Sequence, residues 1–91
     1  MSELAATSRP RVSAGFRLQW EEAQQAWVLL YPEGMVKLNQ SAGEIMKRCD
    51  GQVDLVAITA DLESAFNAKG LEGDVRGFIE IAAKQRWLTW E

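Results

Sequence analysis

Histidine is absent from this sequence, and cysteine occurs once, as Cys49. Histidine is the side chain most often used for general acid–base catalysis, and structural zinc sites are built from clusters of cysteine and histidine. No glycine-rich phosphate loop is present either, because Gly70, Gly73 and Gly77 do not follow a predicted strand. We therefore expect no metal, no cofactor and no catalytic residues, and we interpret Cys49 as an inert core thiol.

Long apolar runs are also missing. No stretch approaches the roughly 20 residues that a membrane span needs, and the first residues lack the apolar core of a secretory signal peptide. The net charge of −3 argues against nucleic acid as a partner, because phosphate binding requires a positive surface. The 91 residues are 47% hydrophobic and include four Trp, which is enough for one small core. These features predict one cytoplasmic domain without a membrane or nucleic-acid partner.

The N-terminal residues 1–14 are small, polar and interrupted by Pro10. We interpret this segment as a flexible N-terminal arm, and residues 15–91 as the folded domain.

Three predicted strands open the domain. Residues 16–20 alternate between apolar and polar side chains, which is typical of a half-buried strand. Residues 26–31 are apolar on both faces, which predicts a central strand. A turn at Pro32–Gly34 then leads into a short strand, Met35–Leu38. The pattern predicts a three-stranded antiparallel sheet whose last strand lies at an edge with one row of unpaired backbone groups.

Three predicted helices follow the sheet. The first begins after Asn39 or Ser41 and ends at Asp50-Gly51, and the second runs from the cap Asp54 to Gly70. The third begins near Glu72. The expected core stripes are Ala42, Ile45, Met46 and Cys49 in the first helix, Leu55, Ile58, Leu62 and Phe66 in the second, and Val75, Phe78, Ile79 and Ala82 in the third. Residues 87–90 are expected to pack back as an extended piece. The fold class is α+β, a three-stranded antiparallel sheet followed by a three-helix bundle.

One stripe of the third helix lies off its core face. Asp74, Phe78, Ile81 and Gln85 follow helical spacing, and Ile81 does not fit the core stripe. If this helix packs beside the strand Met35–Leu38, an open strand edge adjoins an apolar helical surface. That geometry captures an extended peptide by adding it to the sheet as a further strand.

The order of strands and helices resembles a winged helix–turn–helix with its wing moved to the front. The segment LLYPEGMVKLNQSAGEIMKRCDG, Leu29–Gly51, more specifically resembles the pyrroloquinoline quinone (PQQ) biosynthesis protein D (PqqD) family. The run Tyr31–Asn39 carries most of this resemblance, and Arg9-Pro10-Arg11 and Trp87-Leu88 also fit. Two positions depart from the family pattern: Arg86 stands where Gly is usual, and Gly43 where Ala is common.

The resemblance implies a peptide chaperone, or RiPP recognition element, of ribosomally made and modified peptide pathways. Such a domain holds a precursor peptide and presents it to a radical S-adenosylmethionine (SAM) enzyme, which crosslinks a Glu and a Tyr of the precursor. The peptide is expected to add to the third strand and to lie against the third helix. The implied peptide-binding residues are Met35, Val36, Lys37, Leu38, Asp74, Phe78, Ile81 and Gln85.

Two other classes of function are weighed against this one. A winged-helix DNA-binding regulator would need a basic recognition helix, but residues 54–69 carry three acidic side chains and one Lys. A small enzyme or cofactor carrier would need the chemistry that the sequence lacks. The oligomeric state is left open between a monomer and a swapped homodimer.

Overall fold

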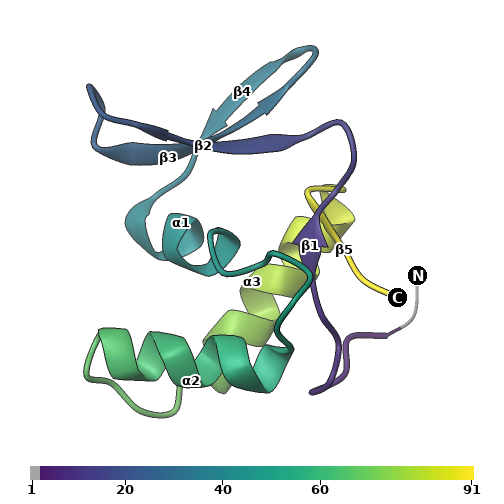
Figure 1. Ribbon diagram of the computed structural model, residues 1–91, viewed down its shortest axis with the longest axis vertical. Coiled ribbons are helices and arrows are strands. Elements are labelled where there is room, and N and C mark those ends of the chain that lie inside the picture. The colour runs from purple at the N-terminus through teal and green to yellow at the C-terminus, as the bar shows by residue number, and fades with distance from the viewer. Residues whose placement is uncertain (1–2) are drawn as a thin grey trace.

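A three-stranded sheet lies over a layer of three helices in the computed structural model, which describes residues 3–91 (Figure 1). Met1 and Ser2 of the predicted arm lie outside the described residues. The elements in chain order are β1 (Arg11–Val12), β2 (Arg17–Glu21), β3 (Ala26–Tyr31), β4 (Gly34–Lys37), α1 (Gln40–Met46), α2 (Leu55–Ala65), α3 (Glu72–Lys84) and β5 (Leu88–Thr89). None of the helices within residues 3–91 has the length and apolar character needed to cross a membrane.

The main sheet has the order β2-β3-β4, and both strand pairs are antiparallel. β3 is the central strand, as its two apolar faces predict, and Leu29 at its middle is fully buried. β4 pairs with β3 only and is an edge strand. The predicted α+β class, with an antiparallel three-stranded sheet and three helices, is confirmed.

The predicted helix starts are accurate, whereas two predicted ends are too late. Asn39 caps α1, because its side-chain oxygen accepts a hydrogen bond from the Ala42 N–H at 2.8 Å, and Asp54 caps α2 in the same way. α1 ends at Met46 rather than Asp50, because the chain tightens there into a turn. α2 ends at Ala65, since Asn67 adopts a left-handed conformation at φ 50°.

The core fills the space between the sheet and the helices. Its largest fully buried side chains include Leu29, Met46, Ile58, Ile79 and Leu88. The predicted core stripes are confirmed at most positions. Phe78 is only half-buried. The assignment of Phe66 to the core is wrong, because α2 ends just before it and leaves its side chain 46% exposed.

Residues 3–14 are packed against the rest of the domain. β1 pairs antiparallel with β5, with Arg11 opposite Thr89 and Val12 opposite Leu88. Leu4 is buried, and its carbonyl oxygen accepts a hydrogen bond from the Arg76 guanidinium at 2.7 Å. The segment that the sequence predicts as a flexible arm is therefore docked in the structure. The domain boundary at residue 15 stays a prediction.

Gly43 lets α1 approach the sheet closely. A Cβ atom at this position would lie 2.8 Å from Cδ1 and 3.1 Å from Cβ of Trp27 on β3. The first contact is too short for a carbon pair and the second is tight, so a side chain here would force Trp27 or the helix to shift. This contact explains why the chain carries Gly inside a helix, where Ala is intrinsically better.

We predict that Gly43→Ala lowers the free energy of unfolding by about 1–2 kcal/mol, because the clash outweighs the gain in helix propensity. Gly77→Ala is the matched control: Gly77 also lies inside a helix, and a Cβ there meets nothing within 4 Å. It should raise stability by up to about 1 kcal/mol. Urea titrations followed by circular dichroism measure both changes. Equal effects of the two substitutions would contradict the close contact.

The end of α3 shows why Gly is usual at the position that Arg86 occupies in this chain. This residue adopts φ 68° directly after the helix. The Trp87 N–H donates to the Ala82 carbonyl and the Arg86 N–H to the Ala83 carbonyl, both at 2.9 Å. These two bonds form a Schellman motif, whose left-handed position favours Gly. Arg86 therefore holds a conformation that costs an L-residue roughly 1–2 kcal/mol.

Replacing Arg86 by Gly should accordingly stabilise the domain by about 1 kcal/mol, since it removes this backbone strain. Arg86→Ala keeps the strain and serves as the control for loss of the charged side chain. A rise of the thermal midpoint in the Gly variant alone supports backbone strain at Arg86, and a rise in both variants contradicts it.

Cys49 is buried at 2% exposure, and its thiol donates a hydrogen bond to the Ile45 carbonyl at 3.3 Å. Burial, with a smaller contribution from the charge of Asp50, raises the pKa of the Cys49 thiol to about 12. Because the native protein holds this proton more tightly than the unfolded chain does, the raised pKa affects the free energy of unfolding. Its stabilising contribution is fully present below the thiol's unfolded pKa of roughly 8.5, and it is lost as the pH rises toward about 12. The predicted role as a core thiol fits this environment.

We therefore expect Ellman's reagent to leave Cys49 unmodified in the native protein at pH 8, because the reactive thiolate is buried and suppressed. The same reagent should modify the thiol rapidly in 6 M guanidinium chloride. Rapid reaction of the native protein would show that the thiol is accessible.

Candidate functional site

The free edge of β4 exposes backbone groups at two residues. The Leu38 N–H donates to the Trp27 carbonyl at 2.9 Å, and the register pairs Lys37 with Val28 and Met35 with Leu30. Backbone hydrogen bonds alternate along an antiparallel pair. The N–H and C=O groups of Met35 and Lys37 therefore point away from β3, toward the open edge.

The side chains of the four predicted strand residues divide between surface and core. Met35 is 47% exposed, and Lys37 is exposed as well. Val36 is half-buried against the core, and Leu38 is buried within it. Because the Leu38 N–H already bonds to β3, Met35 and Lys37 carry the free hydrogen-bonding capacity of this strand.

The predicted stripe of α3 lies at the border of the core. Ile81 is 59% exposed, the highest value among the large apolar side chains described as exposed. Phe78 is half-buried, and Asp74 and Gln85 are exposed. The stripe therefore combines an accessible apolar centre with polar ends, as the sequence predicts.

Strand β4 and helix α3 belong to different layers of the fold (Figure 1). They connect through the core, because Val36 from the strand and Phe78 from the helix pack against the same buried cluster. A role for the eight predicted residues in peptide binding stays a prediction.

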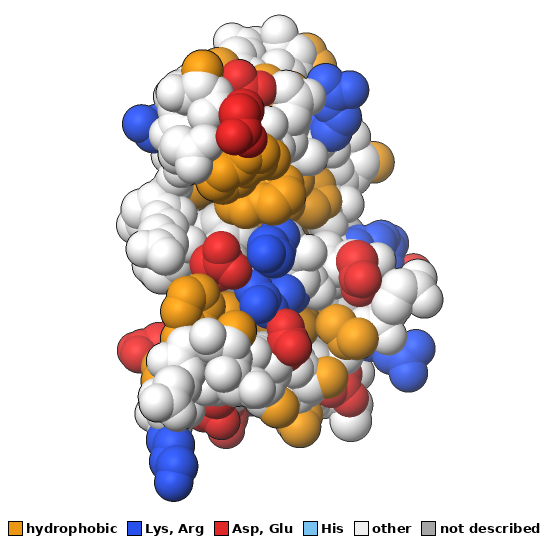
Figure 2. Space-filling view, turned by 60° about the vertical axis from the view of Figure 1, so that its left-hand side comes forward, with side chains coloured by type: hydrophobic (Ala, Val, Ile, Leu, Met, Phe, Trp, Pro, Cys, Tyr) orange, Lys and Arg blue, Asp and Glu red, His pale blue; other side chains and the backbone are white. Residues whose placement is uncertain are grey.

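An ion-pair network holds α1 against α2. The Arg48 guanidinium bonds to the carboxylates of Glu44 and Asp61. Burial acts to lower the pKa of Arg48, but the hydrogen bonds to both carboxylates outweigh it and raise that pKa. On the face shown in Figure 2, charged side chains lie between two hydrophobic areas of the surface. Because its partners lie within the chain, Arg48 stabilises the helical layer and is not an open site for an anion.

Within residues 3–91 no group of three or more His, Cys, Asp or Glu side chains could hold a metal ion. A cavity with mostly apolar walls lies between the helices, and Asp74 is the predicted site residue that lines it. Sequence reasoning missed this cavity, whose walls come from four separate segments.

Comparisons with known proteins agree on one family. The profile of "Coenzyme PQQ synthesis protein D (PqqD)" matches residues 26–88. A "PqqA binding protein" of Pseudomonas aeruginosa is 49% identical over 89 residues, which cover 97% of each chain. The protein of the same description from Methylococcus capsulatus is 50% identical over 72 residues, covering 79% of this chain and 77% of its own.

A solved structure shares the fold. It is the solution NMR structure of the PqqD truncation of Methylobacterium extorquens PqqCD, described as a functional and stand-alone RiPP recognition element. The TM-score is 0.77 at 27% identity, and the match covers 96% of this chain and 95% of the other. The profile match, the relatives and the shared fold together show that the chain belongs to the coenzyme PQQ synthesis protein D (PqqD) family.

Proposed function

We propose that this chain is a non-catalytic peptide chaperone of PQQ biosynthesis. It binds the precursor peptide PqqA as an additional strand along β4 and presents it to the radical SAM enzyme that crosslinks a Glu and a Tyr of the peptide. Binding raises the concentration of the peptide near that enzyme. The domain itself makes no covalent bond.

The observation that carries this proposal is the open edge of β4 in a member of this family. Met35 and Lys37 offer backbone donors and acceptors in the spacing that an added strand uses. The relatives named PqqA binding proteins and the neighbour described as a recognition element support the same function. The exposed Ile81 supplies apolar surface on α3 for the peptide side chains.

The charge of the second helix gives no support to DNA binding. Within Leu55–Ala65, α2 carries Asp61 and Glu63 and no basic residue. A helix that enters the major groove needs positive charge toward the phosphates. The cytoplasmic location and the choice between monomer and swapped homodimer stay predictions.

We predict that Lys37→Pro weakens binding of the PqqA peptide while the domain stays folded. Proline removes an N–H that faces the open edge and so leaves the ladder between β3 and β4 intact. The loss of one backbone hydrogen bond corresponds to about 1–1.5 kcal/mol, or roughly 5- to 12-fold in Kd. Isothermal titration calorimetry with synthetic PqqA measures the change.

Lys37→Ala is the control, because it removes the side chain and keeps the N–H. On α3, Ile81→Asp should weaken binding by a similar factor, since it places a charge on the apolar stripe. Circular dichroism should show a native fold for all three variants. If Lys37→Pro and Ile81→Asp both bind PqqA as the unsubstituted protein does, the proposed site is wrong.

A further inference from the structure

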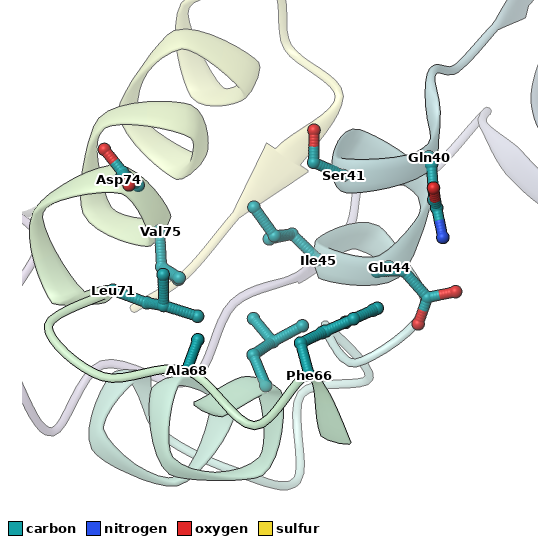
Figure 3. A pocket seen from close by; sticks show the side chains of 10 residues that line it. Gln40, Ser41, Glu44, Ile45, Phe66, Ala68, Leu71, Asp74 and Val75 are labelled. Carbon is teal, nitrogen blue, oxygen red and sulfur yellow. The ribbon is translucent and has the colours of Figure 1, made fainter. Parts of the chain in front are cut away.

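A cavity of about 410 Å³ opens between the three helices. Ligand pockets in proteins occupy roughly 300–1,000 Å³, so this space is large enough for a bulky side chain. Figure 3 shows Ile45, Leu71 and Val75 pointing toward a common space. The apolar walls come from α1, α2, the connection that follows α2, and α3: Ile45, Leu62, Phe66, Ala68, Leu71 and Val75.

The connection between α2 and α3 gives the cavity a fixed wall. A left-handed residue, Asn67, follows the end of α2, and the Ala68 N–H then donates back to the Glu63 carbonyl at 2.9 Å. The carboxylate of Glu63 accepts a hydrogen bond from the Leu71 N–H, also at 2.9 Å. These bonds hold Phe66 at the rim, where 46% of its side chain is exposed. The cavity is therefore built by specific backbone geometry.

The cavity shares one residue with the proposed peptide site. Asp74, at the N-terminal end of the α3 stripe, lines it on one side. On the other side lies Ser41, four residues after Lys37 at the end of β4, and Figure 3 shows the two residues on facing helices. A peptide that left the β4 edge and followed α1 toward Asp74 would pass this cavity.

The charged side chains that line the cavity indicate which kind of peptide residue would bind beside it. Two carboxylates, Glu44 and Asp74, line the cavity, and no Lys or Arg does. Glu44 already pairs with Lys47 and Arg48. No ion pair or hydrogen bond engages the Asp74 carboxylate in the described part of the chain. Asp74 is thus available to a basic residue of a bound peptide.

We propose that this cavity is an anchor pocket for the precursor peptide: it takes one aromatic or long aliphatic side chain, next to a Lys or Arg that pairs with Asp74. This inference rests on the proposed function and adds to it a sequence requirement for the peptide. The strand edge recognises backbone of any sequence, whereas the anchor pocket selects by size and apolar character.

The test replaces a small side chain that lines the anchor pocket by a large one, which fills the pocket. Ala68 lines the cavity, and Ala68→Trp should occupy it without removing a core side chain. The probe is the synthetic PqqA peptide of Pseudomonas aeruginosa, titrated by calorimetry. We expect Kd to rise at least roughly tenfold, the effect of losing one buried anchor. Ala60→Trp is the matched control, because Ala60 is exposed on α2 and does not line this cavity; its Kd should stay within about twofold.

A double-mutant cycle identifies the anchor residue. Each apolar residue of the probe peptide is replaced by Ala, and both proteins are titrated. One replacement should weaken binding to the unsubstituted protein but have no further effect on Ala68→Trp, since the contact is already lost. Asp74→Asn should remove part of the salt dependence of binding, whereas Glu80→Gln, elsewhere on α3, should not.

The outcomes separate this inference from the proposed function. If Lys37→Pro weakens binding and Ala68→Trp does not, the pocket assignment is overturned while strand addition stands. If the unsubstituted protein does not bind the probe peptide, both proposals are overturned. If Ala68→Trp leaves peptide binding intact but impairs association with the radical SAM enzyme or between copies of the chain, the pocket belongs to that partner and the assignment to the peptide is overturned.

Discussion

The close contact between Trp27 and the backbone of Gly43 fixes how the two layers of this domain meet. It seats α1 directly beneath the central strand, at a distance that a Cβ atom would not permit. Since only Leu38 and Asn39 separate β4 from α1, the seating of this helix also sets where the edge strand ends. The position of the free edge therefore depends on one glycine that lies outside the proposed site.

An uncovered edge strand also risks pairing with another copy of the same chain. The structure limits this risk in two ways. β4 spans four residues, and it carries the exposed cation Lys37. Short length and a charged side chain are the usual protections of natural edge strands. Under the proposed function, a flexible peptide would still be able to pair with this edge, because it would gain additional contacts from α3.

Features with local signals could be predicted from the sequence. Asn39 and Asp54 cap helices through their own side chains, and the outward position of Ile81 follows from helical spacing alone. Pairing between β1 and β5 could not be predicted, because two-residue strands at opposite ends of the chain have no periodicity. The cavity could not be predicted either, because its walls come from four separate segments. The exposure of Phe66 was missed because the observed end of α2 comes a few residues before the predicted one.

The pairing of β1 with β5 has a consequence for how this domain can be joined to other proteins. Arg11 and Thr89 lie opposite each other, so segments near the two ends of the chain run side by side, away from the tip of the hairpin formed by β3 and β4 (Figure 1). A second enzyme or a tag attached at either terminus would leave the edge strand unobstructed. Covalent tethering is thus compatible with the geometry of this domain.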